Sequence, residues 1–137
     1  MNFKKLVFAW LAGFFAMFLL SGLWYMVLMA DYYSVQFADV SRAEPLFTWI
    51  VLGYLAVSFL MAYIYPMGYK GLSPVNEGIR FGFFMGLIIA VPSMFIAYAV
   101  NTIPLTGSMV DIIYQIVEKT IGGGVIGYVY GSSAEAE

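Results

Sequence analysis

The chain has 137 residues, of which 63% are hydrophobic and only 10% charged, and its formal net charge is -2. About a quarter of the residues in a soluble domain are charged, so this composition, with a mean hydropathy of +0.89, excludes an ordinary soluble domain and predicts an integral membrane protein. The absence of cysteine and histidine excludes disulfides, thiol chemistry and the usual zinc and haem sites, and the small net charge indicates no nucleic-acid partner.

The first apolar segment runs from about residue 6 to residue 29 and follows Lys4 and Lys5. It is longer than the hydrophobic region of a signal peptide, which has about 7–15 residues, and it ends without a good cleavage site. We therefore expect a retained transmembrane helix. The polar residues 31–44 follow, and their spaced aromatic residues predict a short amphipathic turn at the membrane interface.

Three further apolar segments are long enough to cross a hydrocarbon core of about 30 Å, at about residues 45–65, 78–100 and 108–130. Pro45 suits the first position of a helix, and Pro66 is expected to end that helix. Ser73 and Pro74 indicate a helix start, as N-cap and first-turn residue. A turn containing Pro104 separates the last two segments.

Together the segments predict an all-α integral membrane protein, a four-transmembrane-helix bundle that forms one domain over residues 1–137. Most cationic residues outside the spans fall on one side of the predicted membrane, which holds Lys4, Lys5, Lys70 and Arg80. The other side holds only Arg42, so the positive-inside rule predicts that both termini are cytoplasmic, in a bacterial cytoplasmic membrane. Trp24 and Tyr25 then fall in an aromatic belt near the outer surface.

Small residues recur at every fourth position in the last two segments, as Gly78, Gly82, Gly86 and Ala90 in one and Gly123, Gly127 and Gly131 in the other. This spacing lets helix backbones approach closely. For an antiparallel hairpin about residues 101–107, equal depth places Gly82 near Ile126 and Gly86 near Gly122. We therefore expect the two ladders to pack against each other, with homo-oligomerisation or docking to another subunit as the alternatives.

Polar residues interrupt the last segment, at Asp111, Gln115, Glu118 and Lys119. A charge near the bilayer centre costs about 2.5–3.5 kcal/mol on insertion scales, so these side chains are expected to face protein or water. Pro92 lies at a similar depth in the preceding segment and leaves the carbonyl of Ile88 without its helical donor, which Ser93 or Lys119 could replace. The candidate intramembrane polar site therefore consists of Pro92, Ser93, Asp111, Gln115, Glu118 and Lys119.

Two roles are open for this site. Glu118 and Lys119 could form a structural pair that holds the bundle in register. Alternatively, Glu118 could titrate in an ion or proton path, or in a pocket for a polar lipid headgroup or small ligand. A third interpretation places residues 111–120 at the interface and inserts only the glycine-rich remainder. The aromatic content of 19% would also suit a pigment or quinone site.

The sequence contains no recognisable nucleophile–base pair, metal-ligand cluster or phosphate-binding loop, so we assign no catalytic residue, cofactor or metal. The prediction for function is a non-catalytic accessory or assembly subunit of a larger membrane complex. Its partners would be the lipid bilayer and other membrane-protein subunits or a second copy. The alternatives are a small oligomeric channel or transporter with a polar path through the fourth helix, and a lipid- or small-ligand-binding membrane protein.

Overall fold

The structure is a computed structural model that describes residues 2–132. In this part of the chain every regular element is helical, and the elements are α1 (Phe3–Gly22), η1 (Leu23–Leu28), α2 (Ala30–Gln36), α3 (Phe47–Gly68), α4 (Pro74–Val100) and α5 (Leu105–Ser132). The π-helix η1 continues α1 directly. The predicted all-helical class is confirmed.

By length and composition, three helical segments of the described chain are apolar enough to cross a membrane: Phe3–Leu28, Phe47–Gly68 and Pro74–Val100. Their mean hydropathies are 2.2, 1.9 and 2.2. The fourth long helix, α5, is not among them, because its charged residues and glycines lower its hydropathy. The fourth span therefore stays a prediction.

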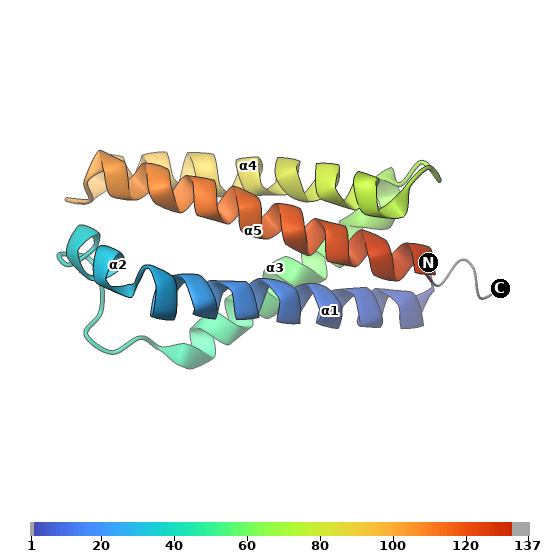
Figure 1. Ribbon diagram of the computed structural model, residues 1–137, viewed down its shortest axis with the longest axis horizontal. Coiled ribbons are helices and arrows are strands. Elements are labelled where there is room, and N and C mark those ends of the chain that lie inside the picture. Colours follow the sequence, from blue (N-terminus) through green and yellow to red (C-terminus); the bar gives the residue numbers. More distant parts are fainter. Residues whose placement is uncertain (1, 133–137) are drawn as a thin grey trace.

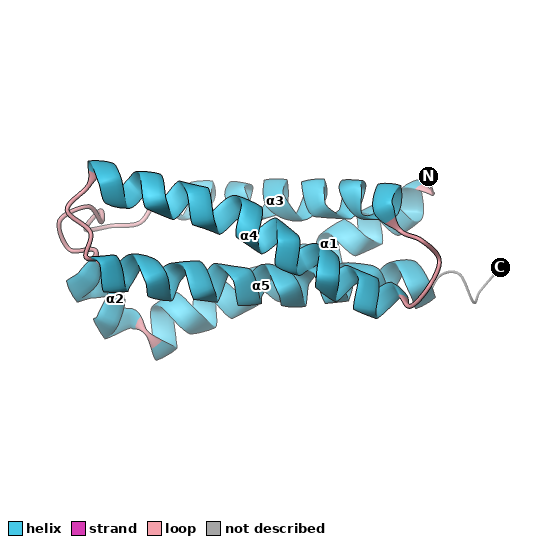
Figure 2. Cartoon of the chain, turned by 90° about the horizontal axis from the view of Figure 1, so that it is seen from above, coloured by secondary structure: helices cyan, strands magenta, loops and turns pink. Residues whose placement is uncertain are grey.

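The long helices alternate in direction, so the connections gather at two ends of the bundle. Figure 1 shows the N-terminus and the end of α5 at one end, which we call the terminal end, together with the α3–α4 connection. Figure 2 shows α2 and the α4–α5 connection at the opposite end, which we call the α2 end. The chain thus returns to its starting end after four long helices.

Helices α4 and α5 form the most extensively packed pair. Their glycines lie along one seam, in which Gly78, Gly82 and Gly86 contact α5 while Gly123 and Gly127 contact α4. A Cβ at Gly86 would lie 2.7 Å from the Cα of Ile116, and a Cβ at Gly123 would lie 2.7 Å from the Cα of Gly82. Because these neighbours are backbone atoms, no larger residue fits without separating the helices.

The expected depth pairing of this seam is wrong. Gly82 lies against the backbone of Lys119 and Thr120 instead of Ile126, and Gly86 lies against Ile116 instead of Gly122. The connection is shorter than expected, because α5 begins at Leu105 and leaves only residues 101–104 between the helices. Ile126 and Gly122 lie against α1 instead, next to Gly13 and Met17.

Two prolines behave differently from the simple expectations. Helix α3 begins at Phe47 rather than at Pro45, and it continues through Pro66 to Gly68. Pro66 cannot donate to the carbonyl of Ala62, four residues earlier. The hydroxyl of Tyr130 donates to that carbonyl at 2.9 Å, so a tertiary contact satisfies the group that the proline leaves free.

The terminal half of the bundle is filled by apolar side chains of α1, α3 and α5, namely Leu6, Ala9, Met17, Met61, Ala62, Tyr65 and Ile126. Toward the α2 end, a smaller cluster between α4 and α5 contains Ala90, Met94 and Ile112. The indole of Trp10 donates to the carbonyl of Leu55 at 2.9 Å and joins α1 to α3. Of the charged residues of α5, Asp111 lies toward the α2 end, and Glu118 and Lys119 lie near the middle of the helix.

Candidate functional site

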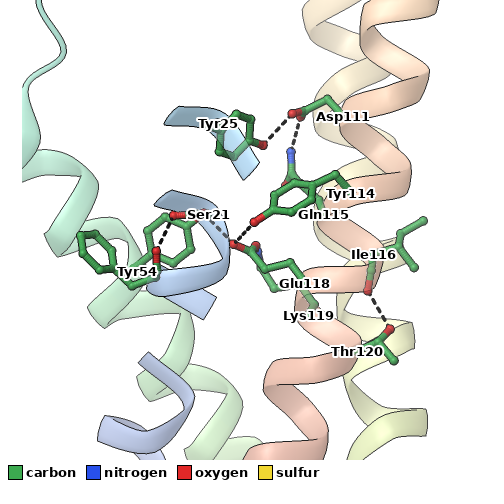
Figure 3. Close-up of polar contacts among 11 residues, drawn as sticks. Ser21, Tyr25, Tyr54, Asp111, Tyr114, Gln115, Ile116, Glu118, Lys119 and Thr120 are labelled. Atoms are coloured by element: carbon green, nitrogen blue, oxygen red, sulfur yellow. Dashed lines mark hydrogen bonds and ion pairs between the residues drawn. The ribbon is translucent and has the colours of Figure 1, made fainter. Parts of the chain in front are cut away.

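Asp111 of α5 is buried, with only 6% of its surface exposed. Its Oδ1 accepts hydrogen bonds from the hydroxyls of Tyr25 at 2.6 Å and Tyr33 at 3.1 Å. Its Oδ2 accepts from Nε2 of Gln115 at 2.6 Å, and Figure 3 shows Tyr25 and Gln115 converging on this carboxylate. The indole of Trp24 donates to the Tyr33 hydroxyl at 3.0 Å, which orients that donor.

The path of the chain after α1 explains how two tyrosines reach Asp111. In η1 the backbone widens to π-helical bonding, and Met29 N–H donates to the carbonyl of Trp24 at 2.9 Å. Such a bulge redirects side chains relative to an α-helix and is frequent at functional sites. Helix α2 then brings Tyr33 to the same carboxylate. Burial raises the pKa of Tyr33, so its hydroxyl stays protonated and donates at neutral pH.

Glu118 lies further along α5 and is 1% exposed. Its Oε1 accepts from the hydroxyls of Tyr54 at 2.8 Å and Tyr114 at 3.1 Å. Its Oε2 pairs with the ammonium group of the neighbouring Lys119. Lys119 Nζ also lies 5.7 Å from the centroid of the Tyr54 ring, within range of a cation–π contact. In Figure 3, Tyr54 reaches this site from α3, beside Ser21 of α1.

Aromatic rings connect the two carboxylates. Trp24 and Tyr114 stack with centroids 4.8 Å apart and planes at 7°. Tyr25 contacts Tyr114 edge-on at 5.1 Å and Tyr33 edge-on at 4.7 Å. We call these four residues, Trp24, Tyr25, Tyr33 and Tyr114, the aromatic cluster. Since its hydroxyls bind both carboxylates, the cluster and the two acids form one buried polar network.

The charges of this network do not balance. It contains two carboxylates and one ammonium group, so its formal charge is -1 when all three are ionised. Among residues 2–132, the only ion pair is the one between Lys119 and Glu118. Asp111 therefore relies on neutral donors, the two tyrosine hydroxyls and the Gln115 amide, to replace its hydration.

The structure brings together four of the six predicted site residues, Asp111, Gln115, Glu118 and Lys119. Pro92 and Ser93 are exposed on α4 and do not join the network. Ala90 packs toward α5, and Pro92, two positions later, lies on another side of an α-helix. The Ser93 hydroxyl donates within its own helix, to the carbonyls of Ile89 at 2.6 Å and Ala90 at 3.1 Å.

Sequence reasoning did not find the tyrosines that bind the two acids. Tyr25 was expected in an outer aromatic belt, and Tyr33, Tyr54 and Tyr114 were given no role in the site. Tyr114 precedes Glu118 by four residues, so helical spacing could have found it. The other three come from η1, α2 and α3, and no local pattern links them to α5.

The network reaches only part of the way through the bundle. Beyond Glu118 the interior is mainly apolar and includes the fully buried Met17, Met61 and Ile126, and its buried hydroxyl at Ser58 donates to its own helix. The described residues contain no group of three or more metal-ligating side chains of the His, Cys, Asp and Glu types. The tyrosine hydroxyls and the Gln115 amide can thus hold a carboxylate charge within the bundle by donating hydrogen bonds to it.

Comparison with protein families gave one match, over residues 8–127, to the family described as "Protein of unknown function (DUF1761)". The comparisons with curated proteins and with solved structures gave no match.

Proposed function

The chain belongs to the DUF1761 family, whose description assigns no activity, and we propose that it is a non-catalytic accessory or assembly subunit of a larger membrane complex. In this proposal α5 is a fourth membrane span and both termini are cytoplasmic, in the bacterial cytoplasmic membrane. The excess of Lys and Arg near the N-terminus and the α3–α4 connection supports that orientation.

The packing of α5 supports its role as a span. The helix has 28 residues, more than the roughly 20 that a span needs. It packs against α4 and α1, and its three charged side chains are all buried. Neighbouring helices therefore remove the polar groups from lipid, as expected for charges that lie within a membrane protein.

The position of α3 carries the proposal. Helix α3 packs chiefly on α1 and has few contacts with α4 or α5. Figure 1 shows α3 crossing α1 obliquely, so that the first turns of α3, at the α2 end of the bundle, stand away from the other helices. Residues 41–50 are all exposed, and a concave surface there includes Arg42, Leu46 and Trp49. A helix of a partner protein would fill the space beside this end of α3.

One face of α3 suits close approach by another helix. Trp49, Gly53, Ala56 and Leu60 follow helical spacing and are all exposed. A Cβ at Gly53 would meet no atom within 4 Å, in contrast to the seam glycines. The glycines of α4 and α5 already pack against each other. This face of α3 is therefore the better docking surface for another subunit.

Site-specific photo-crosslinking in cells tests this proposal. A photoreactive amino acid at Trp49 is expected to give one discrete adduct that contains a second protein, and that protein should co-purify stoichiometrically in mild detergent. Ile88 provides a matched control, because it is 65% exposed on α4. A monodisperse single chain with no adduct at position 49, or equal adducts at positions 49 and 88, would contradict the proposal.

An oligomeric channel or transporter is the second candidate, and the buried polar network of α5 is the observation that favours it. A path through a single chain would have to cross the apolar half of the bundle, where Met17, Met61 and Ile126 are fully buried. A conducting path would therefore need an interface between copies. Ion or proton flux in proteoliposomes that disappears in Glu118→Gln would favour this candidate over the accessory role.

A further inference from the structure

We propose that a groove at the α3–α4 connection binds the headgroup of an anionic phospholipid, with the phosphate between Lys70 and Arg80. The groove lies at the terminal end of the bundle (Figure 1), whereas the docking surface around Trp49 lies at the α2 end. The inference rests on α3 and α4 as membrane spans, and it depends neither on the partner of the accessory role nor on the span of α5.

The groove is formed by the end of α3, the connection and the first turns of α4, and its volume is about 290 Å³. Its lining combines two cationic side chains, Lys70 and Arg80, with the apolar side chains of Leu72, Phe81 and Phe84. Pockets for drug-sized ligands begin at about 300 Å³, so this groove suits a headgroup and not a whole lipid. Its lining is both charged and apolar, as a phospholipid is at the membrane surface.

The two cationic groups are available to a ligand. Both side chains are exposed, and neither belongs to an ion pair among residues 2–132. The carboxylate of the groove, Glu77, binds the connection instead: its Oε2 accepts from the backbone N–H of Lys70 at 2.8 Å, and its Oε1 accepts from that of Leu72 at 3.0 Å. Two cations and one carboxylate give the groove a formal charge of +1, which selects for an anion.

The position of the groove indicates that this anion is a lipid. Helices α3 and α4 are both long and apolar enough to cross a membrane, and the groove lies where they are joined. The connection between two spans lies at the level of the headgroups, and basic pockets between spans bind anionic headgroups there. Leu72 is 77% exposed and Phe84 is 48% exposed, so the rim offers apolar surface that a soluble phosphate compound would not use.

A second groove continues from the first along α3. It has a volume of about 360 Å³, shares Gly68, Glu77 and Phe81 with the first groove, and adds the apolar side chains of Ile64 and Met67. Helices α3 and α4 have few contacts with each other, so the space beside their junction is open to lipid. The glycerol esters and the start of one acyl chain would lie in this second groove, next to the phosphate.

Two lipids with identical chains test the inference on the unaltered protein. Dioleoyl phosphatidylglycerol is anionic, and dioleoyl phosphatidylcholine is zwitterionic. Native mass spectrometry of the protein in a neutral detergent is expected to show one tightly bound phosphatidylglycerol, with at least tenfold higher affinity than phosphatidylcholine. Equal affinities would overturn the inference. Displacement of the lipid by an equal concentration of glycerol 3-phosphate would also overturn it, because the site would then bind a free phosphate.

Substitutions then locate the headgroup. Each basic residue near the membrane surface strengthens attraction to anionic lipid about fivefold, so Lys70→Gln combined with Arg80→Gln should weaken binding of phosphatidylglycerol at least tenfold. Lys4→Gln combined with Lys5→Gln makes the same charge change at the same end of the bundle, on α1, and should alter affinity less than twofold. An equal loss in both double variants would indicate general attraction to a basic surface, and unchanged affinity in the first would place the lipid elsewhere. Either result would contradict the proposed site.

Discussion

The two buried sides of α5 are stabilised in different ways. Toward α4, glycine backbone lies directly against backbone along the seam, beside the apolar cluster that contains Ala90 and Ile112. Toward η1, α2 and α3, the contact consists of long side chains that converge on Asp111 and Glu118. One side therefore depends on the absence of volume, and the other depends on a balance of charge and hydrogen bonds.

This difference predicts which substitutions each side of α5 should tolerate. A seam of backbone contacts has no space for a side chain, whatever its polarity. The network has no requirement for small residues, but it cannot lose one member of a charged pair without leaving the other unpaired in the interior. Substitutions that change volume and substitutions that change charge should thus affect opposite sides of the same helix.

The largest effect is expected at the Glu118–Lys119 pair. Glu118→Leu leaves a buried ammonium group without its counter-charge, which typically costs about 3–5 kcal/mol. Lys119→Leu should have a comparable effect. The double substitution to leucine removes both charges and should recover most of this loss, although the hydroxyls of Tyr54 and Tyr114 lose their acceptor. The free energy of unfolding in detergent measures all three.

The same variants distinguish structure from transport. If the pair is structural, only the single variants lose stability. If Glu118 carries ions or protons, all three proteins fold but lose flux in proteoliposomes, because transport needs the charge itself. Full stability of both single variants would contradict a structural pair.

The next effect concerns the seam. Gly82→Leu places a side chain against the backbone of Lys119 and Thr120, which cannot move aside as a flexible side chain would. We expect a loss of about 3 kcal/mol, at the upper end of ordinary overpacking. Thermal unfolding followed by circular dichroism provides the measurement.

Gly53→Leu is the matched control, because a side chain there meets open space on α3. It should leave the stability of the chain within about 0.5 kcal/mol of the original. Equal melting temperatures for the two leucine variants would mean that α4 and α5 do not need their close approach.

The sequence predicted the helical class and the positions of several helix ends, because long apolar runs and turn residues act locally. The start of α4 is one example, with Ser73 and Pro74 at its N-cap and first position. The continuation of α3 through Pro66 could not be predicted in this way. It depends on Tyr130, which lies 64 residues later and satisfies the carbonyl that the proline leaves free.

The candidate site, too, was predictable where its residues belong to one helix and not where they come from several. Helical spacing on α5 placed Asp111, Gln115 and Glu118 on one face, since three residues of one helix share its geometry. Tyr25 and Tyr54 reach that face from other helices, and their positions depend on which helices are neighbours. The depth pairing of the seam failed for a related reason, because an error of three residues in the turn shifts one whole helix against the other.

A smaller effect is expected at the hydroxyl of Tyr25. Tyr25→Phe removes the 2.6 Å hydrogen bond to Asp111 and keeps the ring in place. Hydrogen bonds to charged groups contribute about 1.5–3 kcal/mol, and the remaining donors limit the loss to about 1.5 kcal/mol. Tyr128→Phe at an exposed position of α5 is the control and should change stability little. A loss of the same size in both variants would show that the network does not stabilise the fold.

The smallest effect is expected at Ser108, and it should have the opposite sign. Ser108 is completely buried, and its hydroxyl has no hydrogen-bond partner among residues 2–132. A buried hydroxyl without a partner is unfavourable relative to a methyl group, so Ser108→Ala should increase the free energy of unfolding by up to about 1 kcal/mol.

Ser58 is the matched comparison for Ser108, since it is equally buried and donates to the carbonyl of Leu55 at 3.3 Å. Ser58→Ala removes that bond together with the hydroxyl, so the two terms offset each other and stability should be unchanged or slightly lower. Equilibrium unfolding of the two alanine variants under identical conditions gives the sign directly. A loss of more than about 1 kcal/mol in Ser108→Ala would mean that an ordered water satisfies this hydroxyl and belongs to the fold near α2.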